Sequence, residues 1–185
     1  MHHTLVAYVE DKPGVLNRVA SLFRRRAFNI ESLAVGHTDQ PEVSRMTIVV
    51  DTDELGARRL EANLYKLVNV LRVEDVTAEA AVVRDLALIK VAASGSTRAQ
   101  VMQLCDVFRA RVVDVTNESL VVEITGTEDK LDGLVDVLRP YGIIEKVRTG
   151  IVAMRRGPNA VNPDPPMVAA HVPAEATDPA VAYSV

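Results

Sequence analysis

The predicted fold depends on residues 10–33, which read Glu-Asp-Lys-Pro-Gly-Val-Leu-Asn-Arg-Val-Ala-Ser-Leu-Phe-Arg-Arg-Arg-Ala-Phe-Asn-Ile-Glu-Ser-Leu. Apolar side chains in this stretch recur at intervals of three or four residues, as they do on one face of an α-helix. They are Val15, Leu16, Val19, Leu22 and Phe23. This pattern predicts a helix from about residue 13 to residue 26. Extended apolar runs precede and follow it, at residues 4–10 and from residue 30, so the stretch is typical of strand, helix, strand.

The turn that enters this helix has the chemistry of a site for a free amino acid. Pro13 suits a first helical turn because its missing N–H would have no partner there. Gly14 costs up to about 1 kcal/mol of helix stability relative to alanine, which suggests a ligand or a neighbouring backbone that needs the room. The free N–H groups near Gly14 to Leu16 favour a carboxylate, and Asp11 offers a negative group to an ammonium.

Asn29, where the chain leaves the helix, could add a neutral donor and acceptor to such a site. The alternative is that Asp11 only caps the turn and that Gly14 only allows close packing, and helix capping is commoner than ligand binding. The residues of the turn, taken alone, leave both interpretations open.

The first 75 or so residues predict the element order βαββαβ. Beyond the first helix, strands are predicted at residues 30–36 and 44–50. A second helix begins in the acidic run 51–54 and continues to about Lys66, and a last strand covers residues 68–76. Such a unit folds as a four-stranded antiparallel sheet with two helices on one face, the ferredoxin-like arrangement.

A second unit repeats this order. Its predicted elements are a strand at 86–93, a helix at 94–109, strands at 112–116 and 120–125, a helix from 127 and a last strand at 143–154. A shift of 85 positions places Leu22 on Val107 and Phe23 on Phe108, among other apolar matches. The same shift places Gly14 on Ala99, so the second unit lacks the Pro-Gly turn that leads into the first helix. The sequence therefore predicts an α+β protein of two tandem ferredoxin-like βαββαβ domains.

The predicted domains cover residues 2–77 and 86–156, with a linker at 78–85. Residues 157–185 are rich in Pro, Ala and Val without any helical or alternating period, and we interpret them as a disordered tail. Strand residues are aliphatic at consecutive positions, as in Ile48-Val49-Val50. This pattern predicts coverage of both sheet faces and hence self-association, as a homodimer or a larger assembly, about a twofold axis.

Composition and charge argue against several classes of protein. No apolar run approaches the roughly 20 residues of a membrane span, and the N-terminus lacks the regions of a signal peptide, so we expect a cytoplasmic protein without a membrane partner. The net charge of −4 argues against general nucleic-acid binding. The basic run Arg24-Arg25-Arg26 is interpreted as a solvated helix end that complements the dipole.

Catalysis and metal binding have no support in the sequence. The four histidines lie in terminal or loop segments without metal-ligand spacing, and no Walker-type loop or Gly-x-Ser-x-Gly elbow occurs. Cys105 is the only cysteine, which excludes an intrachain disulfide. Its apolar neighbours favour a core position over a reactive thiol. We expect no catalytic residue, metal or cofactor in this chain.

The unit in which Asp-Lys-Pro-Gly-Val-Leu (11–16) joins the first strand to the helix resembles an ACT domain, the amino-acid-sensing module. Three longer runs resemble something narrower, the small regulatory subunit of acetolactate synthase (acetohydroxyacid synthase). They are Phe-Asn-Ile-Glu-Ser-Leu (28–33), Ser-Arg-Met-Thr (44–47) and Lys-Leu-Val-Asn-Val-Leu (66–71). The resemblance covers about residues 2–156, including Leu-Ile-Lys-Val (88–91) and Gly-Thr-Glu-Asp-Lys-Leu (126–131) in the second unit.

The resemblance implies a non-catalytic partner of a large subunit that carries thiamine diphosphate, FAD and magnesium. That enzyme condenses pyruvate with pyruvate or 2-oxobutyrate on the route to the branched-chain amino acids. The small subunit raises the activity of the large subunit and confers feedback inhibition by valine, which binds between paired N-terminal ACT domains.

Carried over by position, the implied valine site consists of Asp11, Gly14, Val15 and Leu16 of one chain and Asn29 and Ile30 of the other. Some members of the family have Asn where Asp11 stands, and an acid there still suits an ammonium. The resemblance thus agrees with the chemistry of the turn: the carboxylate on the helix-start amides, the amine near Asp11 and the isopropyl group against apolar residues.

Two other function classes fit parts of the sequence. One is a free-standing ACT-type amino-acid sensor that regulates another enzyme or regulator. The other is a single-strand RNA binder, because RRM domains share the βαββαβ order. RRM domains stack bases on strand aromatics, whereas this chain has three Phe and no Trp, with Phe23 and Phe108 on predicted helices. The sequence therefore favours a sensor over an RNA binder.

Overall fold

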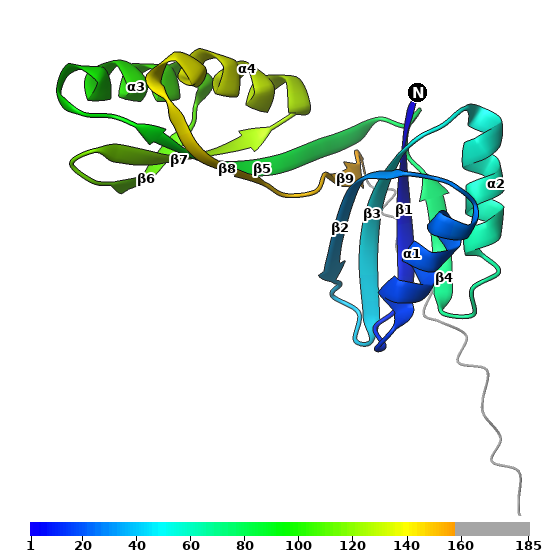
Figure 1. Ribbon diagram of the computed structural model, residues 1–185. Coiled ribbons are helices and arrows are strands. Elements are labelled where there is room, and N and C mark those ends of the chain that lie inside the picture. The colour runs from blue at the N-terminus through cyan, green and yellow to red at the C-terminus, as the bar shows by residue number, and fades with distance from the viewer. Residues whose placement is uncertain (158–185) are drawn as a thin grey trace, which may run out of the picture.

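Two α+β units follow one another in the computed structural model, which describes residues 1–157 (Figure 1). The first unit contains β1 (His2–Glu10), α1 (Val15–Arg25), β2 (Ile30–His37), β3 (Val43–Asp51), α2 (Glu54–Leu64) and β4 (Val70–Asp75). The second contains β5 (Ala81–Ala92), α3 (Gly95–Phe108), β6 (Arg111–Val115), β7 (Ser119–Gly126), α4 (Glu128–Leu138), a 3₁₀ turn (Arg139–Tyr141), β8 (Ile143–Arg148) and β9 (Val152–Arg155).

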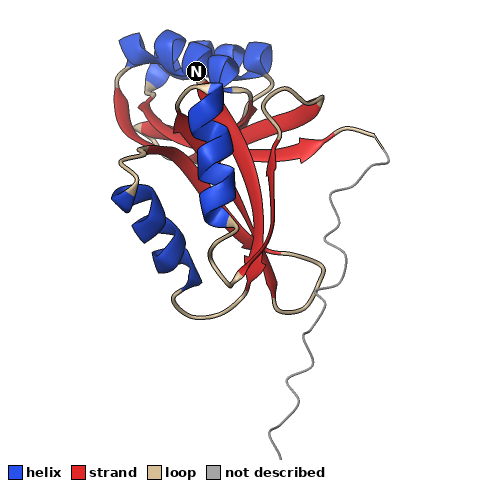
Figure 2. Cartoon of the chain, turned by 90° about the vertical axis from the view of Figure 1, so that its right-hand side faces the viewer, coloured by secondary structure: helices blue, strands red, loops and turns tan. Residues whose placement is uncertain are grey.

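Each unit has the predicted antiparallel sheet with its helices on one face (Figure 1 and Figure 2). The strand order is β2-β3-β1-β4 in the first sheet and β6-β7-β5-β8 in the second. Alternate residues of the central strands point toward the helices, so Leu5, Ala7 and Val9 of β1 pack with Val19 and Phe23 of α1. The prediction of two ferredoxin-like βαββαβ folds is confirmed.

The first helix begins later than the apolar pattern predicts. Gly14 has φ +84° and ψ −5°, a left-handed conformation, and α1 starts at Val15. Pro13 therefore precedes the helix and does not occupy its first turn. A Cβ at residue 14 would have no heavy atom within 4 Å, so the glycine is explained by its positive φ and not by close packing within the chain.

The linker predicted at residues 78–85 is wrong for most of its length, because β5 begins at Ala81. Residues 81–84 pair with β9, with Ala81 opposite Arg155 and Arg84 opposite Val152. The strand predicted at 143–154 is also interrupted, since Thr149 to Ile151 separate β8 from β9. Both errors arise because β9 pairs with residues about 70 positions away, and periodicity along the chain carries no signal of that pairing.

The β5–β9 ribbon covers part of the sheet face that the helices of the first unit leave open. Ala153 is buried there in one cluster with Val6, Tyr8, Val43 and Val76. Coverage of this face, which we predicted to require self-association, comes in part from the same chain.

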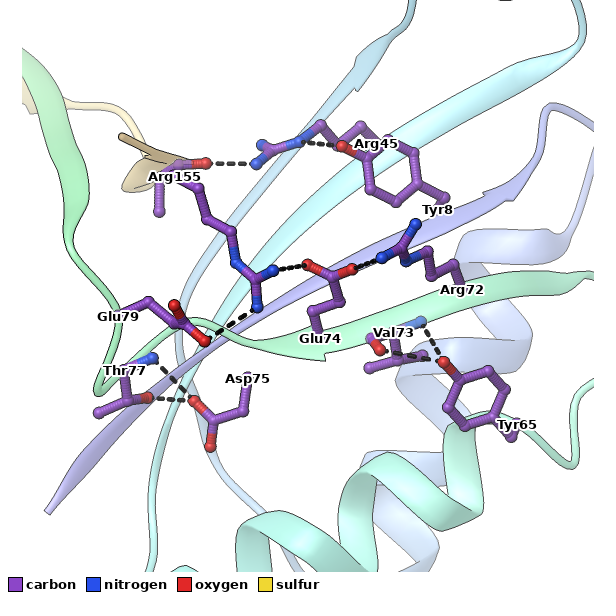
Figure 3. Close-up of polar contacts among 11 residues, drawn as sticks. Tyr8, Arg45, Tyr65, Arg72, Val73, Glu74, Asp75, Thr77, Glu79 and Arg155 are labelled. Atoms are coloured by element: carbon purple, nitrogen blue, oxygen red, sulfur yellow. Dashed lines mark hydrogen bonds and ion pairs between the residues drawn. The ribbon is translucent and has the colours of Figure 1, made fainter. Parts of the chain in front are cut away.

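Polar contacts fix the ribbon to the first sheet (Figure 3). Arg45 lies over the Tyr8 ring, 5.8 Å from its centroid, and donates to the carbonyl of Ala153. Arg155 pairs with the buried Glu74 at 3.4 Å and with Glu79 at 3.2 Å. The two units are therefore joined by an apolar cluster and by charged groups from both.

The connection between β8 and β9 lies directly against β2. The Ile151 N–H donates to Ser32 Oγ at 2.7 Å. A Cβ at Gly150 would lie 2.3 Å from the carbonyl oxygen of Leu33, closer than a real Cβ can come, so this crossing requires glycine.

Strand β2 forms one edge of the first sheet, and within residues 1–157 only β3 pairs with it. None of the described helices is long and apolar enough to cross a membrane. The tail predicted at 157–185 lies outside the described residues apart from Gly157.

Candidate functional site

The start of α1 leaves backbone donors exposed. The helix has no side-chain cap. The Arg18 N–H donates to the Gly14 carbonyl at 3.0 Å and the Val15 N–H to that of Lys12 at 3.3 Å. Within the described residues the amides of Leu16 and Asn17 have no acceptor. Two free N–H groups at the positive end of a helix dipole are suited to bind an anionic group such as a carboxylate.

The corresponding helix of the second unit begins differently. Ser94 and Thr97 form a capping box at the start of α3, in which the Ser94 N–H donates to Thr97 Oγ1 at 3.1 Å. A side chain of the chain itself therefore contacts the backbone at the start of α3, which no side chain does at the start of α1. The two units share a fold, and their first helices begin differently.

The carboxylate of Asp11 lies beside this turn, close to the end of β2. Its Oδ2 is 3.1 Å from Nδ1 of His37, and its backbone N–H donates to the Glu42 carbonyl at 2.7 Å. The His37 side chain is 82% exposed and that of Asp11 is 44% exposed. Asp11 can therefore accept from an ammonium that approaches the turn, in place of or beside the imidazole.

A network behind the turn holds it in position. Asn69, which is buried, donates from Nδ2 to Glu10 Oε2 at 2.5 Å and accepts from Arg18 Nη1 at 2.7 Å. The hydrogen bond from Asn69, followed by the contacts with Lys12, lowers the pKa of Glu10 below its usual value. Lys12 is 3.1 Å from the same carboxylate. Its ammonium is thus paired with Glu10.

The two apolar residues at the start of α1 have different roles. Val15 is buried in the core of the first unit, whereas Leu16 is 44% exposed. Leu16 is the one whose side chain can contact a ligand at this turn, and Val15 contributes by fixing the helix on the sheet.

Asn29 and Ile30 lie at the opposite end of α1 from Gly14. The eleven residues of the helix separate the two groups by roughly 16 Å at 1.5 Å per residue. Asn29 is exposed and donates to Glu31 Oε1 at 2.6 Å. One chain therefore brings Asp11, Gly14 and Leu16 together and leaves Asn29 and Ile30 apart from them.

Two residues near the site were not among the predicted ones. The sequence predicted that His37 lies in a loop. Only the pairing of β2 with β3 places it beside Asp11. Asn69 lies about 58 positions from the turn it supports, and an isolated buried Asn after a helix is a weak signal in a sequence. Both contacts depend on tertiary structure.

No group of three or more His, Cys, Asp or Glu side chains within residues 1–157 is arranged to hold a metal ion. Cys105 is buried as predicted, and burial raises the pKa of its thiol. A raised pKa leaves less of the reactive thiolate.

Two family profiles match the chain. The profile described as "AHAS small subunit-like ACT domain" matches residues 5–72, and that described as "Small subunit of acetolactate synthase" matches residues 84–157. Together they span most of the two units and leave residues 73–83, from within β4 to the start of β5, unmatched.

Individual relatives agree with the profiles. The acetolactate synthase small subunit of Mycolicibacterium smegmatis is 51% identical over 159 residues, which are 86% of this chain and 94% of that protein. A probable acetolactate synthase small subunit of Archaeoglobus fulgidus is 50% identical over 157 residues, 85% of this chain and 98% of that protein. The crystal structure of the acetolactate synthase small subunit from Thermotoga maritima has a TM-score of 0.80 and 37% identity, and covers 85% of this chain and 99% of that one.

Proposed function

This chain belongs to the family of acetolactate synthase small subunits, and on that premise we propose that it is the non-catalytic regulatory subunit of the enzyme. It binds the large catalytic subunit, raises its rate of acetolactate formation, and makes that rate sensitive to valine. Thiamine diphosphate, FAD and magnesium are held by the large subunit, and this chain contributes no cofactor.

The open helix start is the observation that carries the valine site. The amides of Leu16 and Asn17, two exposed residues, have no acceptor within residues 1–157, and a carboxylate would receive both hydrogen bonds together with the favourable dipole. The ammonium of the same amino acid would lie near Asp11, and its isopropyl group would contact the exposed side chain of Leu16.

A second chain would complete the site. Two copies of the edge strand β2, which within residues 1–157 pairs with β3 alone, can pair antiparallel about a twofold axis. In a fully overlapped pair, Ile30 of the partner subunit lies opposite His37, because the strands run in opposite directions. His37 contacts Asp11, so this pairing would carry Asn29 and Ile30 of the partner subunit to the Gly14 turn.

Valine would then act by favouring one arrangement of the two chains. A ligand shifts an equilibrium only by its differential affinity for the two states. A valine held between two chains has such a difference, because its contacts change when the chains move relative to one another. The arrangement that valine favours would make a weaker activating contact with the large subunit.

The Gly14→Asp variant tests this proposal. Aspartate tolerates a positive φ better than most residues, and no atom lies within 4 Å of the new Cβ, so the fold should persist. Its carboxylate would repel that of valine. In assays of acetolactate formation by the large subunit, we expect the variant to activate like the wild type and to lose at least about tenfold in sensitivity to valine, the equivalent of roughly 1.4 kcal/mol.

Gly14→Asn is the matched control, because it has the same shape without the charge and should lose much less sensitivity. Full valine inhibition in Gly14→Asp would contradict the site. A wild-type chain that binds valine but neither binds nor activates the large subunit would instead support a free-standing sensor.

A further inference from the structure

The first unit has a basic groove that the valine site does not use. We define the basic groove by the residues that line it, at the last turn of α1 and the end of α2: Leu22, Arg25, Arg26, Asn63, Lys66 and Leu67. Its volume is about 440 Å³. The groove contains two of the three arginines that the sequence places in succession at 24–26.

The cations of the groove lack counter-charges. Within residues 1–157, no carboxylate lies within ion-pair distance of Arg25, Arg26 or Lys66. Arg26 and Lys66 instead donate to the same neutral acceptor, Asn63 Oδ1, at 3.0 and 3.1 Å. Three like charges thus gather in one groove of a chain whose net charge is −4, and an anionic partner would relieve their repulsion.

The fold itself does not require these charges. Cations complement the C-terminal end of a helix dipole, and α3, the helix at the same place in the second unit, has Arg109 at its C-cap but no basic residue in its last turn. The shift of 85 positions places Val107 of α3 on Leu22 of α1. Val107 is 76% exposed, whereas Leu22 is nearly buried. The second unit folds with the same architecture although no basic residue lies in the last turn of α3 and Arg111 pairs with Glu123 at 3.9 Å, so the fold does not require three cations without counter-charges at this helix end.

The lining indicates the kind of partner. Leu22 and Leu67 give the groove an apolar floor, and Val68, the next residue after Leu67, is 83% exposed. Arg25, Arg26 and Lys66 are exposed around that floor. A small anion is usually held by buried donors, whereas an apolar floor with exposed cations at its rim suits a protein segment that has an apolar side chain flanked by carboxylates.

We propose that the basic groove binds an acidic segment of the large catalytic subunit, with an apolar side chain of that segment against Leu22, Leu67 and Val68. This proposal rests on the proposed function, because it assigns the surface through which the chain acts on its partner. Asn29 follows Arg26 by three residues. Valine contacts at Asn29 would therefore lie beside the groove and could alter its fit to the large subunit.

A triple charge reversal in the full chain tests the proposal: Arg25→Glu, Arg26→Glu and Lys66→Glu. The affinity of the chain for the large subunit, measured by isothermal titration calorimetry, should fall by about a hundredfold. The salt dependence of binding should flatten, because screened ion pairs have been lost. The variant Arg25→Lys, Arg26→Lys keeps the charges and should bind within about threefold of the wild type.

The matched control reverses three exposed cations of the second unit: Arg111→Glu, Lys146→Glu and Arg156→Glu. It changes the net charge equally and should bind like the wild type. Circular dichroism melting of both variants identifies any loss of fold.

The outcomes separate this proposal from the one on which it rests. A wild-type chain that does not bind the large subunit overturns both. If the triple charge reversal in the basic groove binds the large subunit like the wild type, the proposal for the groove is overturned, and the proposed function stands. The same holds if the control reversal in the second unit loses as much affinity as the reversal in the groove. Binding of inorganic phosphate that the groove variant loses, with its affinity for the large subunit unchanged, overturns it in favour of a small-anion site.

Discussion

At the scale of single residues, Gly14 owes its place to backbone conformation. Its φ of +84° turns the chain out of β1 and into α1 without a side-chain cap, and that leaves the amides of Leu16 and Asn17 free. An ordinary N-cap residue such as Ser or Asp would have accepted one of those hydrogen bonds itself. The same glycine therefore shapes the turn and keeps its donors available to a ligand.

Asn69 is the residue whose loss should disturb this turn most. Asn69→Ala removes the hydrogen bonds to Glu10 and Arg18 and leaves Glu10 with its ion pair to Lys12 alone. We expect the free energy of unfolding to fall by about 1–3 kcal/mol, measured by urea denaturation, and valine sensitivity to weaken as the turn loosens.

Asn63→Ala is the control for that measurement. Asn63 makes similar side-chain hydrogen bonds with Arg26 and Lys66, but at an exposed position. Its replacement should cost no more than about 0.5 kcal/mol. Equal losses in the two variants would mean that the buried network does not support the turn.

At the scale of elements, the apolar periodicity of the sequence predicted each helix and strand of the first unit, with errors of a few residues at their ends. It failed at β9, since four residues that complete a ribbon with residues 81–84 have no periodic signature of their own. The turn at Gly14 was predictable because its chemistry is local. The approach of His37 to Asp11 was not, because it depends on the register of β2 against β3.

Asp75 joins the end of β4 to β1 and gives the first sheet a defined response to acid. Its carboxylate is 2.7 Å from Nδ1 of His3 and accepts from the Thr77 N–H at 2.9 Å. Burial raises the pKa of Asp75, but the hydrogen bonds from Thr77 and His3 outweigh it, so the pKa lies below its usual value. A lowered pKa stabilises the fold above the unfolded value, near 3.9, and that stabilisation disappears as the pH falls through the folded value.

Asp75→Asn should therefore be less stable than the wild type at pH 7, by about 1 kcal/mol. The difference should shrink as the pH is lowered from about 4. Chemical denaturation at a series of pH values measures it, with Asp39→Asn, at an exposed position, as a control that should stay within about 0.5 kcal/mol throughout. A difference between Asp75→Asn and wild type that does not vary with pH would contradict this role of the carboxylate.

At the scale of the whole molecule, the proposed site needs two chains, because α1 separates Gly14 from Asn29. The edge strand β2 offers the surface for pairing, and Val35, in the middle of it, is 47% exposed. An exposed apolar residue on an edge strand favours pairing with a strand of another chain.

Val35→Asp should weaken that association. In the fully overlapped pair Val35 lies opposite Ser32 of the partner subunit, so a carboxylate there would be buried between the strands without a counter-charge, which is unfavourable. Sedimentation velocity should find a dimer for the wild type and a shift toward monomer for the variant at micromolar concentration. A variant that remains as dimeric as the wild type would place the self-association on another surface.

The most direct test of the central claim is a calorimetric titration of valine into the complex of this chain with the large subunit. We predict saturable heat with the wild type, its loss in Gly14→Asp and its retention in Gly14→Asn. Undiminished valine binding by the Gly14→Asp complex would contradict the claim that the open start of α1 holds the carboxylate of the effector.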